Sequence, residues 1–222
     1  MRSRSYYTLI ASLPPLPRFD RAERLPITRE RLLERRRMLD PEDADLLDRL
    51  EAFLSWHRQP AARTDEEMVR SYDGMRGRID HPVLKDLCGV LVNQRTIMAG
   101  LRRRHLGLPP PAPGEPWGMG PLKRHMEQNW DDPHFKLQSA YPWIAEAREH
   151  LTAGKTLALD HLLLNRVWDQ ADRLVLGKHF EFEVVLAYLI KWDAIRQWLS
   201  YDAEAAAEFF EQRVLEVMHG NE

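Results

Sequence analysis

Three features of the sequence predict an all-α protein of roughly six to nine helices. Apolar residues recur at spacings of three and four along most of the chain, which is the period of an amphipathic helix. Residues that favour helix ends, such as Thr28, Pro41 and Gly107, stand at the borders of these periodic segments. The alternation typical of a strand is weak and confined to residues 6–11 and 179–183.

The N-terminal segment is expected to be largely extended. Residues 5–19 begin with a short strand or helical turn, and three prolines within residues 14–17 then fix φ and exclude a helix. A helix should start at Thr28 with a partial cap, because Arg31 stands where a capping box has glutamate. Pro41 suits the first position of the next helix, and acidic residues follow it at the positive end of the helix dipole.

The middle of the chain combines helices with a stretch that cannot be helical. Helices are expected at residues 64–74 and 82–107, the second ended by a glycine. Residues 107–121 then hold six prolines and four glycines, which predicts a linker without regular structure. This linker would separate an N-terminal helical half, residues 1–106, from a C-terminal helical half, residues 122–222.

Five further helices are expected in the C-terminal half, at residues 121–130, 141–152, 157–176, 180–199 and 202–219. The most apolar of them should be central, because its stripe covers most of its faces: Val185, Tyr188, Leu189, Trp192, Ile195 and Leu199, widened by Leu186, Ile190 and Trp198. Its expected walls are the stripes Leu159, Leu162, Leu163 and Val167 before it and Phe209, Phe210, Val214 and Leu215 after it.

The composition gives no electrostatic reason to expect nucleic acid or anionic lipid as a partner. The 222 residues include 32 basic and 34 acidic side chains, a formal charge of −2. The single cysteine, Cys88, excludes an intramolecular disulfide and should be an inert core residue, which fits a reducing cytoplasm. We expect neither a secretory signal nor a membrane span, since Lys191, Asp193 and Arg196 interrupt the most apolar segment.

No motif of catalysis or cofactor binding stands out. Residues 153–156 (AGKT) resemble the tail of a phosphate-binding loop, but Glu149 replaces its first glycine, so Gly154 is expected to end a helix. The nine histidines are scattered; Glu146 and His150 share a helix face, but one such pair makes no di-iron site. We therefore expect no catalytic residue, no metal and no cofactor.

Two arginine-rich segments, residues 29–38 and 100–107, are candidates for contacts. They lack the interleaved aromatic residues and the strongly basic surroundings of a nucleic-acid site. A solvated helix face or a protein–protein contact remains for them, since arginine is favoured at interfaces. Trp117, inside the Pro/Gly-rich segment, should dock against another surface. The expected partner interface comprises Arg102, Arg103, Arg104, Trp117, Lys191 and Asp193.

Two segments resemble the C subunit of V/A-type ATPases, which is called the d subunit in eukaryotes. Residues 92–108 (VNQRTIMAGLRRRHLGL) follow that family's N-I-x-x-x-L-R-x-R-x-x-G helix through Asn93, Ile97, Leu101, Arg102, Arg104 and Gly107. Residues 157–200 are similar to the family's last repeat through Leu159, Asp160, Leu186, Ala187, Tyr188, Leu189, Asp193 and Ile195.

Both ends of the chain also resemble a bacterial family of uncharacterised proteins that are encoded within V/A-type ATPase gene clusters. Members open with a YYxLIASLP-like stretch, as Tyr6–Pro14 does, and close with an AYLxKxxIxxWLxxD-like stretch, as Ala187–Asp202 does. The chain is shorter than the full-length C subunit, and the family's glutamate near Asp193 is not in register here.

The resemblance implies a bundle of helical pseudo-repeats, like that of the C subunit, with a non-catalytic role. In that family, the C subunit couples the soluble rotor shaft to the membrane ring of proteolipid subunits. The expected partners are that shaft and ring, and the expected location is cytoplasmic, peripheral to the membrane through the complex, without insertion into lipid and without nucleic acid. Two alternatives remain: a helical enzyme with a His/Glu metal site, and a nucleic-acid or regulatory adaptor that uses Arg102–Arg104.

Overall fold

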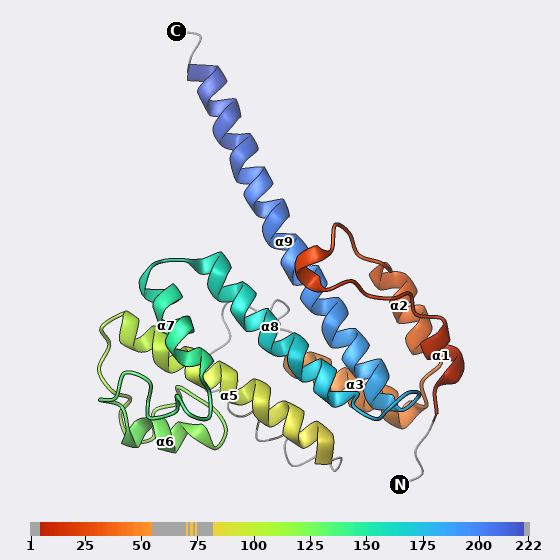
Figure 1. Ribbon diagram of the computed structural model, residues 1–222, viewed down its shortest axis with the longest axis horizontal. Helices are drawn as coiled ribbons and strands as arrows, with labels where there is room; N and C mark the ends of the chain where they lie inside the picture. Colours follow the sequence, from red (N-terminus) through yellow and green to blue (C-terminus); the bar gives the residue numbers. More distant parts are fainter. Residues whose placement is uncertain (1–4, 55–69, 71, 73, 75–81, 220–222) are drawn as a thin grey trace. The chain divides into compact units, whose positions relative to one another are not determined.

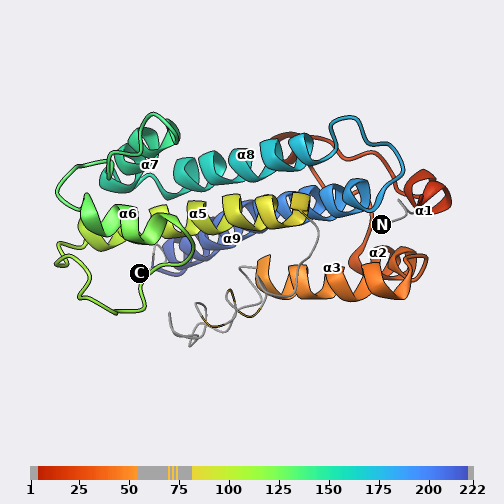
Figure 2. The same ribbon diagram turned by 90° about the horizontal axis from the view of Figure 1, so that it is seen from below.

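The computed structural model describes residues 5–54, 70, 72, 74 and 82–219, with the backbone alone for residues 52–54, 82–83 and 202–219. These residues contain helices and no strand, which confirms the all-α prediction (Figures 1 and 2). The helices are α1 Tyr7–Ala11, the 3-10 turn η1 Phe19–Arg21, α2 Arg29–Arg36, α3 Pro41–Leu54, α5 Pro82–His105, α6 Leu122–Gln128, α7 Trp143–Thr152, α8 Thr156–Leu174 and α9 Phe182–His219. None of these helices is long and apolar enough to cross a membrane.

Most helix ends follow the sequence signals. The Thr28 hydroxyl accepts a hydrogen bond from the Arg31 N–H at 3.4 Å, the partial cap that the sequence predicts. Gly107 ends α5 with a φ of 67°, and Gly154 ends α7 with the same φ. The Gly154 geometry confirms the prediction that this glycine of the AGKT stretch ends a helix. The helix expected at residues 64–74 lies outside the described residues except for positions 70, 72 and 74.

Two helices that the sequence analysis expects as separate elements form a single helix in the structure. The structure joins residues 180–199 and 202–219 into the 38-residue helix α9, because no proline or glycine interrupts Phe182–His219. The second half therefore continues along the axis and cannot fold back as a wall for the first. The weak alternation at residues 179–183 proves to be a bend and the start of α9, and residues 7–11 form the helical turn α1.

The chain forms two compact units, and their border does not follow the predicted division. Unit 1 contains residues 1–39 and 163–222, and unit 2 contains residues 40–162. The expected linker, residues 107–121, has no helix or strand, yet it lies inside unit 2.

Unit 1 buries the apolar stripe of α9 against the N-terminal segment and α8. Its core comprises Phe19, Ala22, Leu164, Trp168, Ala194 and Ile195. The turn η1 packs on α9 (Figure 1). The ring of Phe19 is fully buried, with its centroid 5.9 Å from that of Trp168 and 5.4 Å from that of Trp198. The α8 face in this core carries Leu164 and Trp168, in place of the expected Leu163 and Val167.

Unit 2 is organised around α5, against which α6 and α7 pack (Figure 2). The Pro/Gly-rich segment also packs on this helix. The Thr96 hydroxyl accepts from the Met119 N–H at 2.9 Å and donates to the Met119 carbonyl at 2.7 Å. A Cβ added to Gly118 would lie 2.9 Å from Thr96 Cγ2, and one added to Gly120 would lie 2.8 Å from Val92 Cγ1. Glycine is therefore required for the close approach of residues 118–120 to α5.

Candidate functional site

The six residues expected at a partner interface are divided between the two units, and most have partners within their own unit. Arg102, Arg103, Arg104 and Trp117 belong to unit 2, whereas Lys191 and Asp193 belong to unit 1. Of the six, Arg102 is the one with an exposed side chain.

Arg103 and Trp117 fix the Pro/Gly-rich segment. Arg103 makes a bidentate ion pair with Glu115, 2.5 Å at its closest, and donates to the Pro109 carbonyl at 2.8 Å. These Arg103 hydrogen bonds and the N–H of Ala112 lower the pKa of the Glu115 carboxyl. Trp117 is only 5 % exposed, and its indole N–H donates to Glu127 at 2.9 Å. Trp117 thus docks inside unit 2.

In unit 1, Lys191 and Asp193 of α9 each have a charged partner on the helix surface. Lys191 lies 2.5 Å from the Asp172 carboxylate, with its ammonium 5.1 Å from the Trp168 ring centroid. Asp193 accepts from Arg196, one turn later, at 2.7 Å. Both residues are therefore occupied by ion pairs on the surface of unit 1.

In unit 1, the N-terminal segment from Tyr6 to Ile27 contacts the entrance and the first half of α9. The Tyr188 hydroxyl donates to the Pro14 carbonyl at 2.9 Å, and the Trp192 indole N–H donates to the Ile27 carbonyl at 2.9 Å. The Tyr6 N–H donates to the Phe180 carbonyl at 2.6 Å. Because a proline-rich segment has few hydrogen bonds of its own, two donors from α9 and the Phe180 carbonyl at the entrance of α9 hold the N-terminal segment in place.

An aromatic pair is exposed where these segments meet. The rings of Tyr7 and Phe180 lie 4.1 Å apart, with 58 % and 38 % of each residue exposed. Leu176, in the same connection between α8 and α9, is 75 % exposed. This exposed pair, Tyr7 with Phe180, is a candidate contact surface in unit 1.

Unit 2 contains a small pocket with basic walls at the C-terminal ends of α5 and α7. The lining residues are Leu101, Arg104, His105, Pro133, Arg148, Leu151 and Thr152, and the volume is about 220 Å³. Among the described residues, no carboxylate lines it. We call this the basic pocket.

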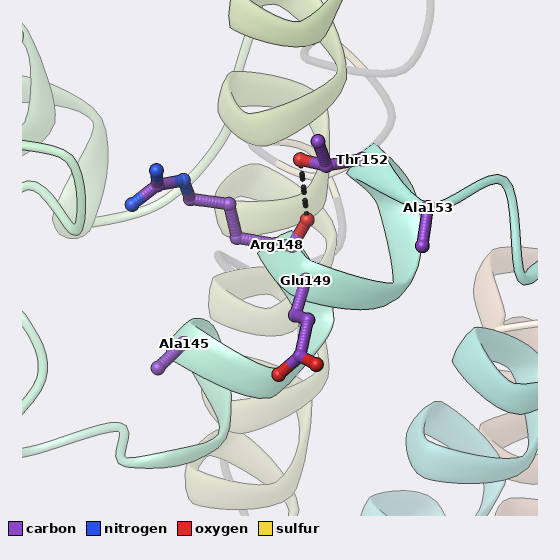
Figure 3. A pocket seen from close by; sticks show the side chains of 5 residues that line it. All are labelled: Ala145, Arg148, Glu149, Thr152 and Ala153. Atoms are coloured by element: carbon purple, nitrogen blue, oxygen red, sulfur yellow. Dashed lines mark hydrogen bonds between the residues drawn. The ribbon is translucent and has the colours of Figure 1, made fainter.

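The basic pocket adjoins a more open hollow of about 440 Å³ on α7, lined by Ala145, Arg148, Glu149, Thr152 and Ala153. In Figure 3 the Arg148 side chain extends away from the Glu149 carboxylate, and the Thr152 hydroxyl donates to the Arg148 carbonyl at 2.8 Å. Arg148 belongs to the walls of both hollows, and no ion pair joins it to a carboxylate of the described residues.

The side chains that the sequence singled out for their chemistry form one pair and no larger group among the described residues. Glu146 Oε1 and His150 Nε2 do face each other, at 3.4 Å, and the described residues contain no group of three side chains that could hold a metal ion. Cys88 is buried, and burial raises the pKa of its thiol from 9.0 to about 12, which keeps it protonated and unreactive near neutral pH.

In comparisons with known proteins, no family model, no curated protein and no solved structure matches the chain. The basic pocket was missed at the sequence level, since Pro133 and Arg148 carry no motif and lie far from Arg104 along the chain.

Proposed function

We propose that this chain is a non-catalytic adaptor, a component of the central stalk of a V/A-type ATPase that resembles its C subunit. It would couple the soluble rotor shaft to the proteolipid ring from the cytoplasmic side. The observation that carries the proposal is the meeting of Tyr6–Pro14 with the entrance and first half of α9. The two stretches that resemble the gene-cluster family are joined in one unit by the hydrogen bond from the Tyr188 hydroxyl to the Pro14 carbonyl, as parts of one functional element would be.

The contacts in unit 1 suit a part that transmits torque. An aromatic core and side-chain donors to backbone carbonyls fix an otherwise irregular segment on a long helix. Interactions of this kind resist sliding, because breaking the buried Trp192–Ile27 bond leaves a carbonyl unpaired and breaking the half-buried Tyr188–Pro14 bond exposes its polar groups to water only in part. Such a body serves a coupling role without any reacting group.

Co-purification tests the proposal. The tagged full chain is expressed with the shaft and ring components of the V/A-type ATPase from the same genome, and the complex is isolated from membranes in mild detergent. We expect the chain in a fixed ratio to the shaft components by quantitative mass spectrometry. Isolation of an intact shaft and ring without the chain contradicts the proposal, as does stoichiometric zinc or iron in a chain that binds no part of the ATPase.

A pair of variants tests whether the exposed Tyr7–Phe180 pair is the contact surface. Phe180→Ser should weaken capture about tenfold or more, because aromatic residues at the centre of an interface contribute about 2 kcal/mol or more. Leu33→Ser is the matched control, since Leu33 is similarly exposed, at 44 %, on α2 of the same unit. Equal loss in both variants would assign the effect to general destabilisation instead.

A further inference from the structure

The basic pocket is locally cationic in a chain of formal charge −2. Arg104 and His105 reach it from α5, and Arg148 reaches it from α7. Arginine guanidinium groups stay protonated in proteins, so at least two positive charges share a hollow whose described walls carry no carboxylate. The partial negative charge at the C-terminal ends of α5 and α7 offsets only part of these charges, so the pocket keeps a net attraction for an anion.

Arg104 is held in position before any ligand arrives. Its Nη1 donates to the Asp132 carbonyl at 2.5 Å, and its guanidinium lies 5.3 Å from the Phe135 ring centroid. The loop that provides these partners is fixed in turn, because the Asp132 carboxylate accepts from the His134 and Lys136 N–H groups at 2.8 and 2.9 Å. One of the five N–H donors of Arg104 is thereby used, which leaves the others for a ligand.

The same loop is strained next to the pocket. Phe135 and Lys136 have φ values of 55° and 53°, a region that side chains other than glycine rarely adopt. Backbone strain of this kind persists where the surrounding contacts over-determine it, and it concentrates at ligand sites. Here the result is a fixed Pro133 and a fixed Arg104 in the wall of a pocket that Arg148 of α7 also lines.

Basic residues also stabilise the C-terminal ends of helices, and α5 ends with four of them. That role is met by any cation in the last turn, including the exposed Arg102. It does not require a hollow, and it does not require Arg148 of a second helix to line the same hollow. The shared pocket is therefore the feature that points to a ligand.

We infer that the basic pocket binds a small phosphate-bearing ligand. A volume of about 220 Å³ is below that of sites for drug-sized molecules, which limits the ligand to a phosphate with few further atoms. Guanidinium groups match phosphate with paired hydrogen bonds, and a group with several oxygens can engage two arginines at once. This site is separate from the proposed coupling role, which depends on unit 1.

The test uses inorganic phosphate and the full chain. Binding is measured by the shift of backbone amide NMR signals in unit 2, with phosphate titrated against sodium chloride at constant ionic strength. We expect saturable shifts around the ends of α5 and α7. Arg148→Gln and His105→Gln should each weaken the phosphate affinity, the arginine variant about tenfold, the equivalent of 1.4 kcal/mol. Arg102→Gln, which removes an exposed charge outside the pocket, should change it less than twofold.

Each alternative outcome overturns the inference in its own way. Chemical shifts that change linearly with phosphate concentration, without saturation, mean that phosphate acts only as a non-specific salt. Equal affinities for the Arg148→Gln and Arg102→Gln variants mean that the pocket is not the site. Acetate that binds as tightly as phosphate means that the ligand class is a carboxylate. Circular dichroism confirms that each variant is folded. The phosphate titration does not depend on the ATPase co-purification, so a failure of one experiment does not change the interpretation of the other.

Discussion

Both units hold an irregular segment against a long helix, but the residues that make the contacts are separated by very different distances along the sequence. In unit 1 the hydrogen bonds from Tyr188 to Pro14 and from Trp192 to Ile27 span 174 and 165 residues. In unit 2 the bonds between Thr96 and Met119 span 23 residues. Closing the longer loop costs more chain entropy, so unit 1 depends more strongly on each anchoring side chain.

The means of anchoring differ as well. Unit 1 uses large aromatic side chains whose polar ends reach carbonyl groups of the N-terminal segment. Unit 2 uses glycines that let the backbone itself approach α5, with Thr96 pairing both the N–H and the carbonyl of Met119. Removing volume should therefore harm unit 1, whereas adding volume should harm unit 2.

The largest effect is expected for Trp192→Ala in unit 1. Trp192 is 4 % exposed, and its loss removes a large buried ring and a hydrogen bond to Ile27. The free energy of unfolding should fall by about 3–5 kcal/mol. Hydrogen exchange followed by mass spectrometry should show faster exchange in peptides from α1, η1 and α9, with little change in α5 peptides. Equal acceleration in both units would show that they unfold together.

Trp192→Phe separates the two contributions. The phenyl ring keeps most of the buried volume, while the Ile27 carbonyl loses its donor. The loss should be smaller, about 1–3 kcal/mol, the cost of an unpaired buried polar group together with a small cavity. A loss as large as that of Trp192→Ala would mean that the hydrogen bond carries most of the anchoring.

Thr96→Val should have the largest effect in unit 2, with the opposite pattern of exchange. The valine has nearly the same shape, but the N–H and the carbonyl of Met119 both lose their partner beside a residue that is 1 % exposed. The expected loss is about 2–4 kcal/mol, measured by urea unfolding. Thr96→Ser keeps the hydroxyl and should lose about 1 kcal/mol. A serine variant as unstable as the valine variant would point to packing instead.

Adding one methyl group to the Pro/Gly-rich segment should test its packing directly. Gly120→Ala places a Cβ 2.8 Å from Val92, which is fully buried, at a φ of 76°. The expected loss is about 2–3 kcal/mol from overpacking and backbone strain. Gly114→Ala is the matched control, since its φ is 84° but no atom lies within 4 Å, so strain alone should cost about 1 kcal/mol. Equal losses would contradict close packing at Gly120.

Local sequence signals predicted the elements of the fold well. The helices that start at Thr28 and Pro41 and the helix that ends at Gly107 follow end signals that act within one turn. The continuity of α9 was missed because an apolar half and a charged half suggested two elements, whereas only a proline, a glycine or a cap would have ended the helix.

The site was harder to predict, for a physical reason. The Pro/Gly-rich composition predicts irregular backbone and does not distinguish a free linker from a segment packed on α5. That difference depends on glycine positions matching Thr96 and Val92 of another element. The basic pocket likewise needs Arg104 and Arg148 from different helices, and such a meeting is set by tertiary packing.

The smallest effect concerns alkaline stability, where each unit contains, among its described residues, one group with a raised pKa. Burial raises the pKa of Cys88 in unit 2 from 9.0 to about 12 and that of Tyr188 in unit 1 from 10.0 to about 12. In both cases the unfolded chain loses its proton first as the pH rises, so stability is complete below the ordinary pKa and declines above it. The Cys88 contribution to this decline should be about 1.4 kcal/mol at pH 10 and should be absent in Cys88→Ala.

Tyr188, which is only half-buried, should add a smaller decline above pH 10 that Tyr188→Phe removes. Urea unfolding between pH 8 and 11 measures both, and a Cys88→Ala variant that declines as steeply as the natural chain from pH 9 would show that the thiol is hydrated and that α5 is less tightly covered than its contacts indicate.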